Sequence, residues 1–154
     1  MVAYRTVVVG YDGSPDADRA VAAAADEVAD GGTVHVVTAY HPVPVSDVMR
    51  RLDELPEEYR WVWDPHATET ERQQAALARL RAHGVGCVGH VVADDPAKAV
   101  LDVSEREHAD LVVVGGRGLG AVHRFLRGSV SARVAAHATT SVLVVQDARP
   151  AADG

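Results

Sequence analysis

A glycine-rich, basic segment has the residue types of a phosphate-binding site. It reads GGRGLGAVHRFLRGSVS over residues 115–131 and continues the apolar run LVVVG. It contains five glycines, three arginines and no acidic residue, in a chain whose formal net charge is −7. Glycines let backbone N–H groups approach an anion closely, and an arginine guanidinium holds phosphate oxygens through a planar fork of donors. The segment therefore indicates phosphate binding, with an ordinary glycine-rich loop as the alternative.

A helix start closes the same segment. Gly128–Ser129 begins a predicted helix that runs to about His137. The first turn of a helix has unpaired N–H groups and a partial positive charge, which suit a phosphate. The Ser129 hydroxyl is a further donor, and Arg124 and Arg127 add positive charge.

Several catalytic signatures do not fit. No Gly-Lys-Ser/Thr follows the glycines, so the segment is not a P-loop, and no Gly-x-Ser-x-Gly nucleophile elbow occurs. GRGLGA over residues 116–121 matches a dinucleotide fingerprint in form only, because it follows the fourth strand and leaves too little chain for a partner domain. Asp94–Asp95 stands where a receiver domain has its phosphoacceptor, but Gln146 replaces the lysine that such a domain needs.

The histidines and the cysteine are interpreted as structural. The eight histidines show no His-Glu-x-x-His pairing. His35 and His90 fall within predicted strands and lack evident convergent partners. The single cysteine, Cys87, excludes an internal disulfide and a cysteine-rich zinc site.

Strands and helices alternate along the chain and position the glycine-rich segment. Apolar runs such as RTVVVG are typical of parallel strands buried on both faces. Ser14 and Pro15 suit a helix N-cap and first position, Asp95–Pro96 repeats that start, and Thr68-x-x-Glu71 resembles a capping box. The predicted strands are residues 5–10, 33–39, 85–92, 111–115 and 141–145. The predicted helices are residues 15–30 (ended by the glycine pair 31–32), 46–55, 68–83, the helix after residue 95, and 129–137.

This order predicts the fold class. Strands joined by helical crossovers run parallel, so we expect an α/β protein with an open five-stranded parallel sheet and helices on both faces. One domain is expected over residues 1–147, with a frayed tail at 148–154. Such sheets bind ligands beyond the carboxyl ends of their strands, where the strand order reverses, and the glycine-rich segment starts at such an end.

Composition and charge argue against several classes of protein. A net charge of −7 does not favour nucleic-acid binding. No stretch approaches the ~20 apolar residues that span a bilayer, and the N-terminal residues MVAYRTVVVGYDG do not form a secretion signal. We expect a cytoplasmic protein without a membrane or nucleic-acid partner.

The motifs together resemble those of a known family. Gly115-x-x-Gly118, nine residues and then Gly128–Ser129 is similar to the ATP-binding signature of the universal stress protein family. The runs VVVGYDGSPDADRAV and ADDPAKAVLDVSEREHADLVVVGGRG, and the closing SVLVV, resemble the same family. The resemblance covers nearly the whole chain except about residues 41–67 and the tail, and it favours the ATP-binding subclass.

The resemblance implies a fold and a binding site. The family's sheet is Rossmann-like (adenine nucleotide alpha hydrolase-like) with strand order 3-2-1-4-5, which brings Asp12 beside the Gly115 loop. Asp12 would contact the base or ribose of ATP and help hold Mg²⁺, although turn chemistry alone favours a helix-capping role. Ala39 would read the adenine edge, where the family usually has valine. The implied cofactor-binding residues are Gly10, Asp12, Ala39, Gly115, Gly116, Arg117, Gly118, Gly120, Arg127, Gly128, Ser129, Val130 and Ser131.

The function implied is that of a nucleotide-dependent stress-response protein. No general base other than Asp12 is evident near the phosphate loop, so at most slow ATP hydrolysis is expected. Two alternatives stay open: a partner-binding module without nucleotide, and a weak ATPase or nucleotide hydrolase on the same fold. The pyrophosphatase and nucleotidyl-transfer relatives match poorly, because YDGSP replaces their Ser-Gly-Gly-x-Asp-Ser loop.

Two surfaces are candidates for protein contacts. The last strand, Ser141–Val145, is apolar and uncharged and would form a sheet edge, so we predict a homodimer joined there. Tyr59, Trp61 and Trp63 cluster in the irregular region and would either cover the sheet or form a lid or partner surface.

Overall fold

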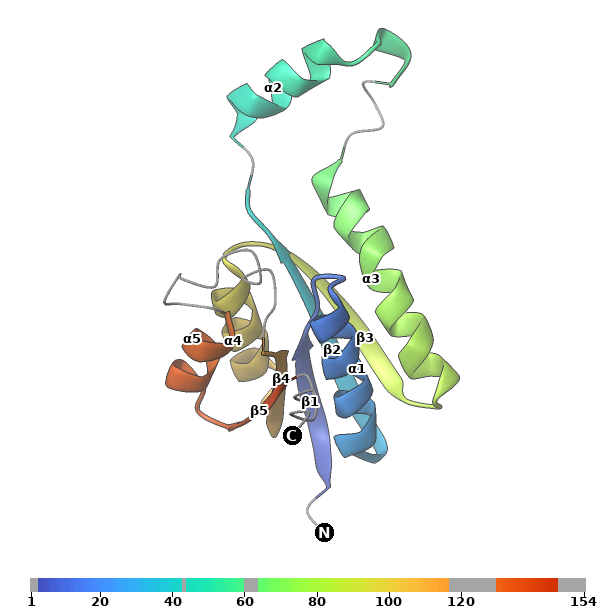
Figure 1. Ribbon diagram of the computed structural model, residues 1–154, viewed down its shortest axis with the longest axis vertical. Helices are drawn as coiled ribbons and strands as arrows, with labels where there is room; N and C mark the ends of the chain where they lie inside the picture. Colours follow the sequence, from blue (N-terminus) through green and yellow to red (C-terminus); the bar gives the residue numbers. More distant parts are fainter. Residues whose placement is uncertain (1–2, 43, 60–63, 117–129, 147–154) are drawn as a thin grey trace, which may run out of the picture.

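The protein is built on a five-stranded parallel sheet, shown in Figure 1. The computed structural model describes residues 3–42, 44–59, 64–116 and 130–146. The strand order is β3-β2-β1-β4-β5, and every neighbouring pair is parallel. The predicted fold class and strand order are therefore confirmed. The strands are β1 (Tyr4–Gly10), β2 (Val28–Tyr40), β3 (Gly86–Ala93), β4 (Leu111–Gly115) and β5 (Ser141–Val145).

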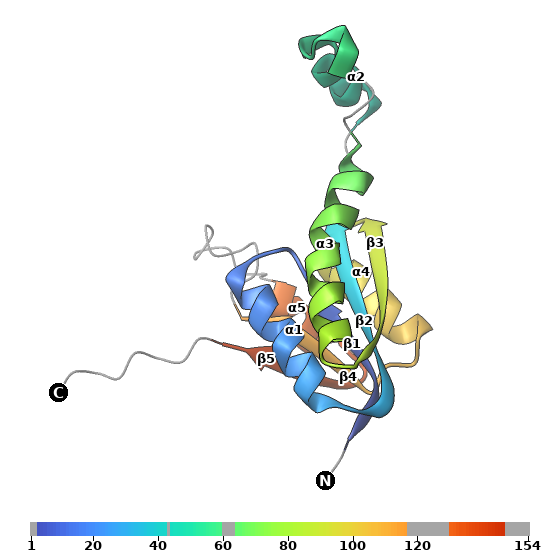
Figure 2. The ribbon, with the colours of Figure 1, turned by 90° about the vertical axis from the view of Figure 1, so that its right-hand side faces the viewer.

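Helices cover both faces of the sheet because the strands are apolar on both sides. Val7 and Val9 of β1 pack in one core cluster and Val8 in the other, and all three are fully buried. Helices α1 and α3 lie on the first face, and α4 and α5 on the second (Figure 2). The helices are α1 (Pro15–Glu27), α2 (Val45–Glu54), α3 (Pro65–Ala82), α4 (Pro96–Arg106) and α5 (Val130–His137), with a 3-10 turn η1 (Glu57–Tyr59).

Side-chain caps start α1 and α4 as predicted. Ser14 Oγ accepts a hydrogen bond from Ala17 N at 3.1 Å, and Asp95 Oδ2 accepts one from Lys98 N at 3.1 Å. A proline follows each cap at the start of the helix. These caps determine where the first turns of the two helices lie, and both turns border the cleft described below.

The predicted end of the first helix is wrong. α1 ends at Glu27 rather than near residue 30, because Val28 adopts an extended conformation and pairs with Tyr4 as the first residue of β2. The glycine pair 31–32 does not end α1 but lies within β2, where it allows the backbone of β2 to approach that of β1. A Cβ at Gly32 would lie only 2.7 Å from Arg5 O.

The predicted capping box of the third helix is also wrong. α3 starts at Pro65, because Asp64 is its N-cap and accepts a hydrogen bond from His66 N through Oδ1 at 2.9 Å. Thr68 lies inside the first turn, where its Oγ1 donates to Asp64 O at 3.1 Å. Apart from these two helices and the early start of β2, the predicted boundaries lie within one residue of those observed.

The irregular region forms an arm at one end of the molecule. α2 and η1 stand away from the sheet in both views (Figures 1 and 2). Of the predicted aromatic surface, Tyr59 ends η1, whereas Trp61 and Trp63 lie outside the described residues. Neither α2 nor any other helix in the described part of the chain has the length and apolar character needed to cross a membrane.

Candidate functional site

A cleft opens at the carboxyl end of the sheet, between the ends of β1 and β4. These strands are neighbours, but the chain continues from β1 toward β2 and from β4 toward β5. The gap between them is therefore the switch point at which open α/β sheets bind ligands. The cleft encloses about 520 Å³ including its open mouth. Its described lining comprises Gly10, Tyr11, Asp12, Ala17, Val37, Ala39, Pro96, Val100, Val114, Gly115 and Val130.

One wall of the cleft is apolar and offers strand-end backbone groups. Val37, Ala39 and Val100 contribute to it. The pairing of β1 with β2 ends at Gly10 and Val37, and Tyr11 N donates to Val37 O at 2.8 Å. Ala39 lies two residues further along β2, so its N–H and C=O point to the same side as those of Val37, past the end of β1. A flat heterocycle on this wall would find apolar contact together with a donor and an acceptor.

Three helix N-termini border the cleft, one from the α1 side of the sheet and two from the α4 and α5 side. α1 contributes Ala17, α4 contributes Pro96 and α5 contributes Val130 to the lining. Each residue belongs to the first turn of its helix. The N–H groups of first turns carry a partial positive charge that favours an anion. The cleft therefore suits a ligand that has an apolar ring and an anionic tail.

Asp12 is the carboxylate among the described lining residues. Its Oδ1 accepts a hydrogen bond from Ser14 N at 2.9 Å, and Gly13 between them has a φ of 80°. Because Ser14 is the N-cap of α1, Asp12 stabilises the turn before the helix rather than the first helical turn itself. A carboxylate has two acceptor oxygens, so Oδ2 remains suited to a ligand hydroxyl or a cation.

Two glycines of the lining allow close packing around the cleft. A Cβ at Gly10 would lie 3.3 Å from Val100 Cγ2, and a Cβ at Gly115 would lie 2.9 Å from Asp16 O. Gly115 thus allows the first turn of α1 to rest directly on the end of β4. The walls of the cleft therefore approach each other closely at both glycines.

A polar group of three residues holds α1 against α3 beside the cleft. Tyr11 is 7 % exposed and donates its hydroxyl to Asp18 Oδ1 at 3.3 Å. Arg79 Nη1 of α3 lies 2.7 Å from the same oxygen. Burial raises the pKa of the Tyr11 phenol, and the Asp18 carboxylate raises it further. Tyr11 therefore remains a neutral donor whose position in the cleft wall is fixed.

An ion pair holds α5 against the start of α4. Arg133 Nη1 lies 2.8 Å from Asp95 Oδ1, and this hydrogen bond holds the pKa of Asp95 below its usual range. The only lysine of the chain, Lys98, is bound outside the described lining by Asp94 at 2.9 Å and Asp102 at 2.8 Å. Hydrogen bonds to Asp102 and Asp94 raise its pKa. Positive charge for an anionic ligand therefore has to come from helix ends and arginines.

The structure brings part of the predicted binding set together. Gly116 is described but does not belong to the lining, since its N–H donates to Val145 O at 2.8 Å. Ser131 is buried within α5. The predicted residues that line the cleft are Gly10, Asp12, Ala39, Gly115 and Val130. The predicted residues outside the described part of the chain are Arg117, Gly118, Gly120, Arg127, Gly128 and Ser129.

Sequence reasoning missed most of the residues that shape the walls. The first turns of α1 and α4 were recognisable from their Ser-Pro and Asp-Pro starts, but nothing local shows that they face one cleft. Only the strand order places them there, because it brings the ends of β1 and β4 together. The missed lining residues are Tyr11, Ala17, Val37, Pro96, Val100 and Val114.

Comparison with known proteins agrees with this architecture. The model of the universal stress protein family matches residues 3–146. The chain belongs to the universal stress protein family. A universal stress protein of Thermus aquaticus is 36% identical over 152 residues, which cover 93% of this chain and 99% of the relative. A universal stress protein of Mycobacterium tuberculosis (strain ATCC 25618 / H37Rv) is 35% identical over 150 residues, which cover 94% and 98%.

A solved structure of the family extends the comparison to three dimensions. It is a universal stress protein in complex with cAMP, and it aligns with a TM-score of 0.71 at 31% sequence identity. The alignment covers 94% of this chain and 98% of that one. The sheet and its helices are therefore those of the universal stress proteins, as the motifs indicated.

Proposed function

We propose that this universal stress protein binds an adenine nucleotide in the cleft and acts as a nucleotide-dependent regulator of the stress response. One observation carries the proposal: the cleft at the switch point combines an apolar wall with three helix N-termini. A relative that is 31% identical and of matching length was solved in complex with cAMP, which supports the ligand class.

The adenine ring lies on the wall formed by Val37, Ala39 and Val100. The N–H and C=O of Ala39 point past the end of β1, where they bind the polar edge of the base. The small side chain of Ala39 leaves room for the ring, although it supplies less apolar contact than the valine usual in the family. Asp12 accepts a hydrogen bond from the ribose through Oδ2.

The phosphates lie toward the glycine-rich segment and the start of α5. The arginines at 117, 124 and 127 provide more positive charge than one phosphate needs, so ATP is the proposed ligand, with Mg²⁺ held in part by Asp12. ATP binding would then act by changing the conformation of the protein or its affinity for a partner, and not by fast ATP hydrolysis. Asp12 is the only general base that the described lining offers, and its Oδ1 already accepts from Ser14 N.

Isothermal titration calorimetry with the full chain tests the nucleotide proposal. ATP, ADP, AMP, cAMP and GTP are titrated with and without Mg²⁺. We expect one site per chain, with ATP bound more tightly than GTP, because the Ala39 backbone matches the adenine edge. No heat with any adenine nucleotide at millimolar concentration would favour the partner-binding module instead.

A cleft-filling variant tests the location of the site. Ala39→Phe places a ring where the base is proposed to lie and should weaken ATP binding by at least about tenfold, while Ala82→Phe on an exposed position of α3 should not. Equal ATP affinity in both variants would place the nucleotide elsewhere.

We also propose that the chain forms a homodimer through β5. This strand is an edge of the sheet, and the hydrogen bond from Gly116 N to Val145 O shows which residues face β4. By alternation, Val142 and Val144 direct their backbone groups outward, where a second copy can pair. Val144→Pro removes an outward N–H and should yield a monomer by sedimentation velocity, whereas Val144→Thr should remain a dimer. A monomeric parent protein at micromolar concentration would refute the pairing.

A further inference from the structure

Two histidines face each other on the α4 side of the sheet. His35 lies on β2, and His90 of β3 pairs with Val37, whose side chain packs in the α4 cluster. Residues two apart on a strand, and residues paired between strands, share a face, so both imidazoles lie on this side. His35 Nδ1 is 2.9 Å from His90 Nε2, and the ring centroids are 5.2 Å apart. Neither residue belongs to the lining of the cleft.

Glu107 brings a carboxylate to the same point. It is the C-cap of α4, and its N–H donates to Val103 O at 2.9 Å. One carboxylate oxygen and one nitrogen of each imidazole all lie within 4.8 Å of one another. His35 is buried at 8 % exposure, whereas His90 and Glu107 are half-buried. Because β3 is the other edge of the sheet, an ion can reach this histidine cluster from solvent.

We propose that His35, His90 and Glu107 form a binding site for a divalent transition-metal ion, with Zn²⁺ as its best match. Two imidazoles and one carboxylate are a ligand set typical of Zn²⁺, with water as a fourth ligand, and they are too rich in nitrogen to favour Mg²⁺ or Ca²⁺. In tetrahedral coordination, two nitrogens at about 2.0–2.1 Å from one Zn²⁺ are about 3.3–3.4 Å apart. His35 Nδ1 and His90 Nε2, which are 2.9 Å apart, would therefore have to separate by about 0.4 Å and turn toward the ion.

A hydrogen bond joins the two imidazoles. One of His35 Nδ1 and His90 Nε2 donates to the other over 2.9 Å, so a metal bound to both nitrogens would displace that proton. The C-terminal end of α4 adds a partial negative charge beside Glu107.

Arg106 brings a positive charge beside the histidine cluster. Its Nε lies 3.3 Å from Glu107 Oε1, and its Nη2 lies 3.4 Å from His90 Nδ1. The Arg106 side chain is 61% exposed, so it can turn into solvent when a metal binds. Arg106 therefore offers a way to test the metal site. A bound metal would compete with the Arg106 guanidinium for the cluster, so removing Arg106 should strengthen metal binding.

Zinc titration of the metal-free, untagged full chain tests this site. At pH 7, without nucleotide, we expect one Zn²⁺ per chain by calorimetry. His90→Gln and Glu107→Gln should each weaken the Zn²⁺ affinity by more than about tenfold, and Arg106→Gln should strengthen it severalfold. The matched control His137→Gln removes an exposed imidazole of α5 and should leave the affinity unchanged.

Three results would overturn the proposal. These are no stoichiometric Zn²⁺ binding, an unchanged affinity in both His90→Gln and Glu107→Gln, or an equal loss in His137→Gln, which would indicate adventitious binding to surface histidines. If His90→Gln loses its native circular dichroism, Glu107→Gln at the helix end decides. Asp12→Asn should retain Zn²⁺ binding, so a failure of the nucleotide proposal is separable from a failure of this one.

Discussion

Replacing Asp12 by Asn and by Ala separates two roles that this side chain combines. Oδ1 accepts from Ser14 N at 2.9 Å, and Asn keeps that acceptor whereas Ala removes it. Both variants remove the negative charge proposed to serve the ribose and Mg²⁺. The stability of the protein and its affinity for nucleotide should therefore respond differently to the two substitutions.

The expected magnitudes follow from these interactions. A turn hydrogen bond contributes about 0.5–1.5 kcal/mol net, so Asp12→Ala should lower the free energy of unfolding by about 1 kcal/mol. In a chain of this size that corresponds to a Tm lower by about 2–4 °C. Asp12→Asn should change stability by less than about 0.5 kcal/mol. A hydrogen bond to a charged group is worth about 1.5–3 kcal/mol, so both variants should weaken Mg·ATP binding by roughly 10- to 150-fold.

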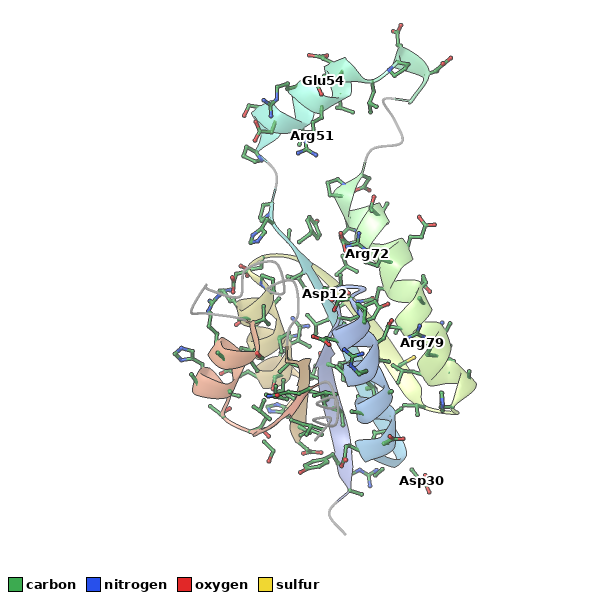
Figure 3. The ribbon with its side chains drawn as sticks, viewed as in Figure 1. Asp12, Asp30, Arg51, Glu54, Arg72 and Arg79 are labelled. Atoms are coloured by element: carbon green, nitrogen blue, oxygen red, sulfur yellow. The ribbon has the colours of Figure 1, made fainter. Side chains whose placement is uncertain are left out.

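Calorimetry with ATP, with and without Mg²⁺, measures the affinity, and urea unfolding followed by circular dichroism measures the stability. Asp30→Asn is the matched control, because it removes the same charge at the opposite end of the sheet (Figure 3). An Asp12→Asn variant that binds Mg·ATP as tightly as the parent chain would refute the ligand role. A loss of stability in Asn equal to that in Ala would refute the turn bond.

Three further substitutions test how the site is supported. Gln73 is 2 % exposed, and its Nε2, which has two N–H donors, lies 2.9–3.0 Å from three oxygens of β2 and β3. Gln73→Leu should lower the free energy of unfolding in urea by about 2 kcal/mol, against less than about 0.5 kcal/mol for the exposed Gln74→Leu. Gly115→Ala should lower the free energy of unfolding by about 1–3 kcal/mol, because the added Cβ would lie 2.9 Å from a backbone oxygen of α1. An unchanged Tm in thermal unfolding would show that α1 can shift to make room for the methyl group. The hydrogen bond from Arg133 lowers the pKa of the Asp95 carboxyl in the folded protein. The stability that the Arg133–Asp95 pair contributes is therefore present above the unfolded pKa near 3.8 and is lost as the pH falls through the lower pKa of the folded state. Asp95→Asn keeps the cap, and its stability deficit at pH 7 should shrink below about pH 4; a deficit independent of pH would contradict the ion pair.

Much of the fold is predictable because its signals are local. The apolar runs of β1, β4 and β5 and the caps Ser14 and Asp95 depend on residues close together in the chain. One error arose from a partner distant in the sequence and the other from a competing residue nearby. Val28 belongs to β2 and not to α1, because it pairs with Tyr4. Asp64, one turn before Thr68, is the N-cap of α3.

By itself, the sequence determined the element types, the parallel sheet and, through its motifs, the family, since periodicity and capping act within a few residues. The tertiary structure alone decided which side chains share a site. Asp12 and Gly115 line one cleft because β1 pairs with β4, and His35 faces His90 because β2 pairs with β3 in one register. Such meetings depend on how whole strands and helices pack. A shift of one residue in the β2–β3 register, for example, would place His35 and His90 on opposite faces of the sheet.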